Sequence, residues 1–241
     1  MESRPLGLDT IAVALTDGWQ VATATRGTSI AYAAIFTLIG AVILGLLLSQ
    51  GFTPFLLAAA GAFMLVGPAV LAGFFGIAQA HEEGRKVGFG ETARGFAAAS
   101  NTIWVIALIS ALLFMIFVTD AAILYSYMIG GAPVWLTELV PATAGVMDFL
   151  FWGAVSGFVI AFLLFCISAF SVPLLCERRA GLVNAVVASV RVVFGNFLPA
   201  MTWAALLAGL VMGSILLLPL LPLTLPWLAY ASRSLYRQVF P

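Results

Sequence analysis

The chain has 241 residues, of which 63% are hydrophobic and 8% are charged, and its mean hydropathy is +1.15. A water-soluble domain carries charges on roughly a quarter of its residues, so water cannot be the solvent for most of this surface. The formal net charge is zero, which gives no basic bias toward a nucleic-acid partner. We therefore expect an integral membrane protein whose main partner is the lipid bilayer.

Long stretches without charged residues predict the membrane spans, because a helix needs about 20 apolar residues to cross the hydrocarbon core. No charged residue lies between Arg26 and Glu82, and a turn containing glycine and proline divides this interval. The stretch 192–232 also lacks charge and is long enough for two helices, although three prolines interrupt it. The predicted spans are 29–49, 55–80, 102–129, 149–175, 197–217 and 219–236.

The last stretch has two interpretations: two helices, or one crossing followed by a re-entrant piece. With six helices and the N-terminus inside, all ten Lys and Arg residues lie on the cytoplasmic side. The external loop 130–147 then holds Glu138 and no basic residue. With five helices, Arg233 and Arg237 would lie outside. The positive-inside rule favours six helices, with both termini cytoplasmic in a bacterial inner membrane.

A short, weakly amphipathic segment precedes each pair of spans, at about 9–25, 87–100 and 180–195. Apolar residues share one helical face in each segment. They are Ile11, Leu15, Trp19 and Ala22; then Phe89, Ala93 and Phe96; then Leu182, Val186, Val190 and Val193. We interpret the fold as all-α: one integral membrane domain, 1–241, built from three pseudo-repeats of an interfacial helix and a transmembrane hairpin.

Asp120 is the only ionisable residue well inside an apolar run. A carboxylate in a membrane span is unfavourable and is by default a candidate for function. The alternative is that its helix, which is nearly 30 residues long, extends beyond the bilayer. Asp120 would then lie near the outer interface, satisfied by water, Tyr125 or Tyr127.

His81, Glu82 and Glu83 lie together at the predicted cytoplasmic end of the second span. Consecutive residues point around a helix, whereas helical metal sites use ligands three or four residues apart. A solvated helix end that stops at Gly84 is therefore the preferred interpretation. The sequence predicts no metal, no cofactor and no catalytic residue.

Glycine pairs with GxxxG spacing occur twice within the spans, at Gly153 with Gly157 and at Gly209 with Gly213. This spacing permits close approach of two helices. Packing within the bundle itself is preferred over a contact with another chain.

Four stretches of the sequence carry a family resemblance: Gly67-Pro68, Gly73 and Glu82-Glu83-Gly84; Phe170 to Leu175; Ala185 to Ser189 with Asn196 and Trp203-Ala204; and Leu235-Tyr236-Arg237. Together they resemble an uncharacterised bacterial family of integral membrane proteins, the domain of unknown function 2189 family. The resemblance covers about residues 55–240 and implies a six-helix inner-membrane protein without an established activity. Family members often carry histidines where this chain has Tyr230 and Ser234, and proline where it has Phe197. A haem or metal site built on those histidines is not expected here.

Three functional hypotheses follow from these patterns. The leading one is a non-enzymatic scaffold or accessory component of a membrane assembly, with other membrane proteins as partners. It rests on the short loops, the small-residue faces and the lack of reactive constellations. The first alternative is a small-solute transporter or permease, suggested by the repeat, the proline-broken final helix and Asp120. The second is a membrane-lipid-acting enzyme that uses His81, Glu82 and Glu83 at headgroup level.

Overall fold

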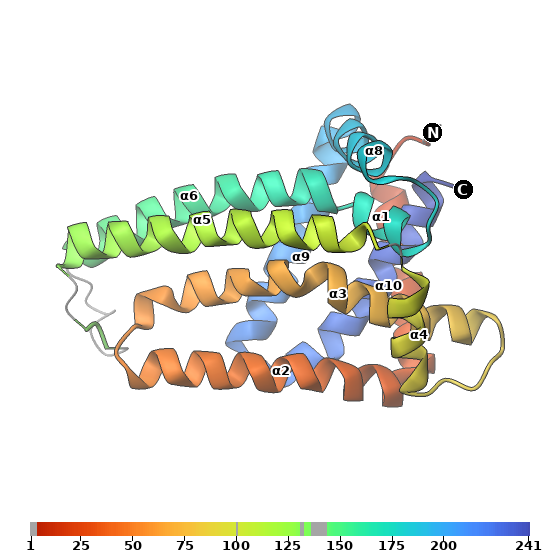
Figure 1. The fold of residues 1–241 in the computed structure, drawn as a ribbon, viewed down its shortest axis with the longest axis horizontal. Coiled ribbons are helices and arrows are strands. Elements are labelled where there is room, and N and C mark those ends of the chain that lie inside the picture. Colours follow the sequence, from red (N-terminus) through yellow and green to blue (C-terminus); the bar gives the residue numbers. More distant parts are fainter. Residues whose placement is uncertain (1–3, 100, 131–132, 136–143) are drawn as a thin grey trace.

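The structure is a computed structural model that describes residues 4–99, 101–130, 133–135 and 144–241, with side chains for all of these except 54, 57–66, 68 and 69. Four long helices run lengthwise (Figure 1): α2 (Arg26–Ser49), α3 (Leu56–Glu82), α5 (Ile103–Ile129) and α6 (Ala144–Ser168). The shorter helices are α1 (Leu8–Ala24), α4 (Gly90–Ala98), α7 (Ser171–Cys176), α8 (Leu182–Gly195), α9 (Phe197–Leu216) and α10 (Leu221–Val239). Two 3-10 turns, η1 (Thr53–Phe55) and η3 (Leu218–Leu220), precede α3 and α10. The predicted all-α class is confirmed.

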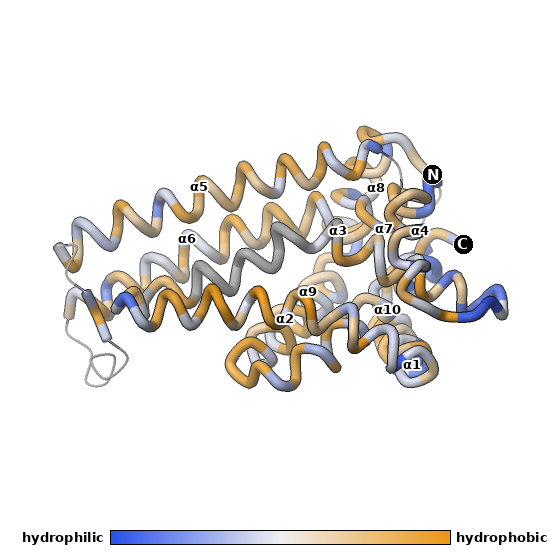
Figure 2. The backbone as a smooth tube through the Cα atoms, turned by 60° about the horizontal axis from the view of Figure 1, so that its bottom comes forward, coloured by the Kyte–Doolittle hydropathy of each residue, from blue (hydrophilic) through white to orange (hydrophobic). Residues whose placement is uncertain are grey.

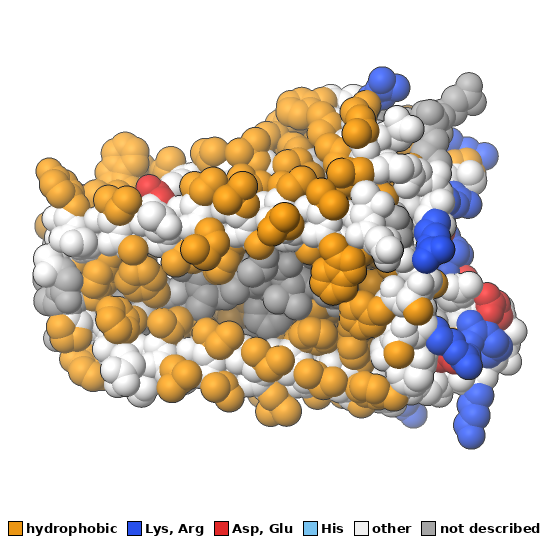
Figure 3. Space-filling view, viewed as in Figure 1, with side chains coloured by type: hydrophobic (Ala, Val, Ile, Leu, Met, Phe, Trp, Pro, Cys, Tyr) orange, Lys and Arg blue, Asp and Glu red, His pale blue; other side chains and the backbone are white. Residues whose placement is uncertain are grey.

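Four helical runs are long and apolar enough to cross a membrane: α2, α5, the run Ala144–Cys176 formed by α6 and α7, and α9. Their outer faces are apolar and exposed, with Leu38, Leu108 and Phe158 each about two-thirds or more accessible. Hydrophobic residues extend along α2, α5 and α6 in Figure 2, and they cover most of the face drawn in Figure 3. An apolar surface of this extent needs lipid as its solvent.

The predicted span 149–175 differs from the structure because it contains a break. Ser189 of α8 inserts its hydroxyl where the helical ladder would continue, accepting from the Phe170 N–H at 3.2 Å and donating to the Cys166 carbonyl at 2.8 Å. Pro173 has no N–H with which to resume that ladder. The insertion of a side chain into the backbone hydrogen bonds is a recognised cause of a sharp helix bend.

The densest core lies at one end of the molecule, not along the middle of the long helices. Residues of α1, α3, α7, α8 and α10 meet there, and the largest fully buried side chains include Tyr236, Phe170 and Leu174. The Lys and Arg side chains on the face drawn in Figure 3 gather toward this same end, and both termini lie there in Figure 1. We call it the charged end.

The first amphipathic segment packs along α10. A Cβ at Gly18 of α1 would overlap the backbone of Ala231, so the two helices approach closely. The Trp227 indole N–H donates to the Leu15 carbonyl at 2.8 Å, and its ring meets Trp19 edge to face at 5.5 Å. The buried residues of α1 are Ile11, Ala14, Gly18 and Ala22. Of the four residues predicted to form the apolar face of this segment, Ile11 and Ala22 are among them.

The second segment, α4, buries its small and polar side and leaves its aromatic residues outside. Gly95 of α4 lies against Gly76 of α3, and a Cβ at Gly76 would overlap the Glu91 carbonyl oxygen. Phe89 and Phe96 are 51% and 38% exposed. Close helix approach at paired glycines therefore positions α4 on α3.

The last two helices form a hairpin that is tilted against the long helices. Figures 1 and 2 share a horizontal long axis, and in both the hairpin of α9 and α10 stops short of the end reached by α2, α5 and α6. Its tip is the η3 turn at Leu218–Leu220. The position of this tip bears on how the chain is threaded through the bilayer.

Candidate functional site

A cluster of four charged side chains joins three helices at the charged end. Glu82 ends α3, Glu177 follows α7, and Arg233 with Arg237 lie one turn apart on α10. We call these four residues the charged cluster. Its members are distant in sequence, so only the fold brings them together.

Arg233 is the centre of the charged cluster. Its guanidinium donates to both carboxylate oxygens of Glu82, at 2.5 and 3.0 Å, and its Nε donates to Glu177 at 3.2 Å. Its side chain is only 6% exposed, and the guanidinium carbon lies 5.8 Å from the centre of the Phe75 ring. The hydrogen-bond donors of this buried guanidinium are paired with two carboxylates, and the group lies over an aromatic ring. Both contacts suit the planar geometry of arginine.

Arg237 repeats the bridge one helical turn later. Its Nε donates to Glu177 at 3.0 Å, and its Nη1 donates to Glu82 at 3.0 Å. The Tyr236 hydroxyl adds a third donor to Glu177, at 3.3 Å. Each carboxylate of the charged cluster therefore accepts from both arginines.

The ends of α3 and α7 place the two carboxylates. At the end of α3, the Arg85 N–H donates to the Ala80 carbonyl while Gly84 adopts a left-handed φ of 66°. This is a Schellman turn, and the predicted stop at Gly84 is confirmed. At the end of α7, the backbone N–H of Arg179 donates to the Leu174 carbonyl in the same pattern, and Arg178 adopts the left-handed conformation.

A carboxylate at a helix C-terminus faces the negative end of the helix dipole, which is unfavourable. The arginines of α10 compensate for this at both helix ends. Burial disfavours ionisation of Glu82, but the hydrogen bonds and charges of Arg233 and Arg237 outweigh burial and lower the pKa of this carboxyl. Burial opposes the charge of Arg237 as well, and the bonds from Glu177 and Glu82 raise its pKa. Glu82 and Arg237 are therefore both charged near neutral pH.

A second ionic group fixes α4 to the end of α3. Glu91 is 8% exposed and accepts from Arg85 and Arg94, both at 2.5 Å. Arg85 also donates to Glu83 at 2.6 Å, and Gln79 donates to the same carboxylate at 2.8 Å. These two bonds lower the pKa of Glu83.

The three residues predicted at the end of the second span do not converge on a common centre. Glu82 turns toward α10, Glu83 bonds to Gln79 and Arg85, and His81 is exposed. Among the described residues, no group of three or more His, Cys, Asp or Glu side chains is placed to hold a metal ion. The chemistry of this end is therefore ion pairing.

Asp120 lies apart from both ionic groups. It sits on α5 nine residues before the end of the helix, about 14 Å along the axis at 1.5 Å per residue. Its Oδ2 atom is buried and has no hydrogen-bond partner within the described part of the chain. Tyr127, one of its predicted partners, is 87% exposed.

Arg233, Arg237 and Glu177 were not predicted as site residues. Basic residues in a membrane protein are first interpreted as markers of the cytoplasmic side. That interpretation gives no reason to look for ion pairs between them and acidic residues. A signal was available in the spacing of Arg233 and Arg237, which puts both on one face of a helix. Their partners could not be found from spacing, because Glu82 and Glu177 come from separate helices.

The fold and the ionic end together define an all-helical integral membrane protein. A family model described as a predicted integral membrane protein (DUF2189) matches residues 55–177, just over half of the chain. The chain belongs to this family, as its sequence motifs predicted. No curated protein and no solved structure gives a significant match. Of the four stretches that carry the resemblance, the first two lie within the matched residues and the last two lie beyond them.

Proposed function

We propose that this protein is a non-enzymatic scaffold or accessory component of a membrane assembly in a bacterial inner membrane. The observation that carries the proposal is an unpacked face of small residues on α9. Ala205, Gly209 and Gly213 recur at intervals of four, and a Cβ at either glycine would meet no atom of the described residues within 4 Å. Such a face lets a second helix approach closely, so it fits a neighbouring membrane protein.

Two glycines of other long helices lie against aromatic side chains of the same chain. Gly157 of α6 lies against Phe117 of α5, where a Cβ would come within 3.1 Å of the ring. Gly73 of α3 lies against Tyr32 of α2 in the same way. The contrast supports a contact outside the chain for α9, because no atom of the described residues fills the space beside its two glycines.

The ionic groups support a structural role over a catalytic one. Glu82, Glu177 and Glu91 each bond to two arginines. The lowered pKa of Glu82 makes this carboxylate a weak base, so it is poorly suited to take up a proton from a substrate. Both groups tie helix ends together, which is the requirement of a rigid scaffold.

For the threading, we propose that six apolar helices enter the bilayer, with the charged end and both termini in the cytoplasm. The positive-inside rule supports this side for the Lys and Arg residues. The chain order also supports three pseudo-repeats, since α1, α4 and α8 each precede a helical pair. The hairpin of α9 and α10 is the shallower pair and returns to the cytoplasmic side.

Isolation of the tagged full chain in mild detergent, after chemical cross-linking in membranes, tests the scaffold proposal. We expect a stoichiometric membrane-protein partner, and we expect the double variant Gly209→Leu/Gly213→Leu to reduce its recovery at least about tenfold, equivalent to the loss of about 1.4 kcal/mol of association free energy. The variant itself should fold, because the space beside both glycines is open.

Ala154→Leu is the matched control. Ala154 is exposed on α6 beside large residues such as Phe158, so leucine there adds apolar volume to the lipid-facing surface of a different helix. The control should leave partner recovery unchanged. A strictly monomeric particle with no partner would contradict the proposal.

A further inference from the structure

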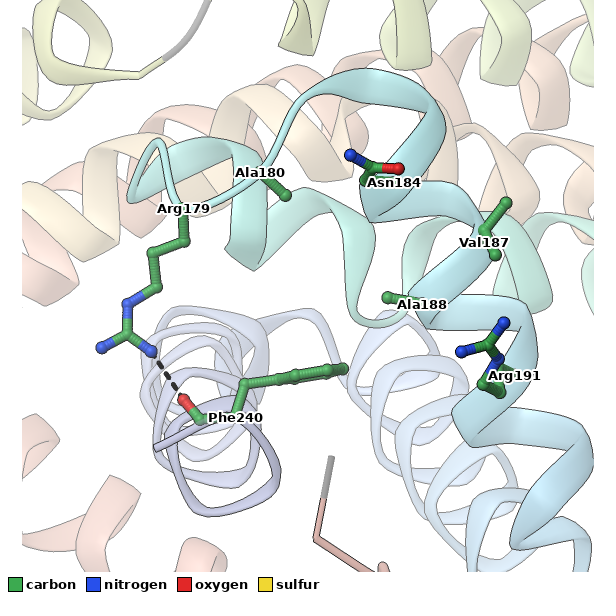
Figure 4. A pocket seen from close by; sticks show the side chains of 7 residues that line it. All are labelled: Arg179, Ala180, Asn184, Val187, Ala188, Arg191 and Phe240. Atoms are coloured by element: carbon green, nitrogen blue, oxygen red, sulfur yellow. Dashed lines mark hydrogen bonds between the residues drawn. The ribbon is translucent and has the colours of Figure 1, made fainter. Parts of the chain in front are cut away.

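A hollow of about 290 Å³ lies between α8 and the C-terminal end of α10. Arg179, in the turn after α7, and Arg191, on α8, line it from opposite sides of the Phe240 ring (Figure 4). Asn184 and Val187 complete the side formed by α8. The lining thus combines two guanidiniums and an amide with apolar surface.

The hollow is electropositive. Arg191 is exposed and forms no ion pair with any described residue. Arg179 donates to the Phe240 carbonyl at 2.6 Å, and its Nε lies 3.8 Å from the nearer Glu177 oxygen. Glu177 is already bonded to both arginines of the charged cluster, so it neutralises Arg179 only in part. No acidic side chain is among the described residues that line the hollow.

The position of α8 relates the hollow to the membrane surface. Val183 and Phe194 expose 72% and 59% of their surface on one side of this helix. Figure 1 places α8 toward the charged end, beside the end of α6, and these two helices are in contact. An amphipathic helix at this boundary rests its apolar side in hydrocarbon and its polar side among headgroups. The hollow therefore lies at the depth of lipid phosphates.

We propose that this hollow is a binding site for the headgroup of an anionic phospholipid. Arg179 and Arg191 donate to the phosphate oxygens, and the Asn184 amide donates to the polar headgroup. Val187, which is 47% exposed, contacts the apolar part of the same lipid, and the buried Phe240 ring backs the hollow. A free phosphate ion would bind the same two guanidiniums, whereas only a lipid also contacts the apolar lining.

Native mass spectrometry of the full chain in detergent tests the site with dioleoyl phosphatidylglycerol, dioleoyl phosphatidylcholine and inorganic phosphate as probes. We expect one phosphatidylglycerol to bind at least about tenfold more tightly than phosphatidylcholine. Arg191→Gln should weaken phosphatidylglycerol binding about tenfold, as expected for one charge-assisted hydrogen bond. Asn184→Phe keeps both arginines but fills the hollow, and it should weaken binding similarly.

Arg26→Gln is the matched control, because Arg26 is an exposed arginine at the start of α2, away from the hollow. It should leave binding unchanged. Equal binding of the two lipids, or an equal loss in Arg26→Gln, would overturn the site. Displacement of the lipid by millimolar inorganic phosphate would overturn the lipid assignment in favour of a free anion. The proposed α9 interface is separate and would survive any of these results.

Discussion

Arg233 on α10 holds the Glu82 carboxylate at the end of α3 through two hydrogen bonds of 2.5 and 3.0 Å, across 151 positions of the sequence. The same guanidinium reaches Glu177 behind α7. One buried side chain of α10 thus fixes the ends of α3 and α7 relative to one another. The rigidity of the charged end depends on it.

Replacing Arg233 should therefore destabilise the protein strongly. Arg233→Gln leaves Glu82 and Glu177 close together without their shared cation, and we expect a loss of roughly 3 kcal/mol in the free energy of unfolding. Unfolding in detergent, followed by circular dichroism, measures it. Arg94→Gln is the control: this side chain is 70% exposed, so its loss should cost at most about 1 kcal/mol. Similar losses in the two variants would refute the central role of Arg233.

Acid should weaken the fold through Glu82. Its pKa is lowered in the folded state from an ordinary value of 4.5, so the unfolded chain takes up the proton first as pH falls. The contribution of ionised Glu82 to the free energy of unfolding is complete above pH 4.5. It is lost as the pH falls through the lower pKa that Glu82 has in the folded state. Glu82→Gln should therefore show a flatter decline in unfolding free energy below about pH 4.5. Asp9→Asn removes an exposed carboxylate and should keep the wild-type slope.

The contact of α4 with α3 should tolerate no side chain at Gly76. A Cβ there would overlap the Glu91 carbonyl oxygen and the Gly95 backbone, so Gly76→Ala should cost about 2 kcal/mol of stability through overpacking. Gly209→Ala introduces the same methyl group at a position where no atom of the described residues lies within 4 Å, and it should be neutral or stabilising. Thermal unfolding midpoints in detergent compare the two. An unchanged midpoint for Gly76→Ala would contradict the close approach.

Asp120 should be dispensable for folding. Its buried Oδ2 has no partner in the described part of the chain, so Asp120→Asn removes an unfavourable charge and should raise the unfolding free energy by about 1 kcal/mol. A loss of stability would reveal an ionic partner. Solute flux in proteoliposomes that falls on this substitution would favour the transporter alternative over the scaffold.

The tip of the last hairpin should remain inside the bilayer. A cysteine at Leu217, which is 60% exposed, should resist a membrane-impermeant maleimide applied outside intact cells. Gln50→Cys, in the turn after α2, should react. The native Cys166 and Cys176 are both buried, at 5% and 7% exposure, so wild type provides an unlabelled background. External labelling of Leu217→Cys would show that α9 and α10 cross completely.

Several features of this fold could be predicted from single segments. The absence of charge between Arg26 and Glu82 indicates helices in lipid, because hydropathy and helix length are local properties. The stop at Gly84 is local as well, since only the left-handed conformation of one residue is involved. The same holds for the family motifs, which are short runs of adjacent residues.

Other features depend on contacts between distant segments and could not be predicted in this way. Ser189, which belongs to a different helix, breaks the predicted span 149–175. No pattern within that span predicts the insertion of its side chain. The open face at Gly209 and the occupied face at Gly157 have the same GxxxG spacing, and only their surroundings distinguish them.

Local sequence features predict that lipid surrounds this chain and where most of its helices lie, because the hydrophobic content of each segment governs both. Which charges pair depends on the tertiary structure. Arg233 lies within α10 and Glu82 ends α3, and only the packing of α10 against α3 brings the two side chains together. Ion pairing at short range follows distance in space, and the order of residues along the chain does not fix that distance.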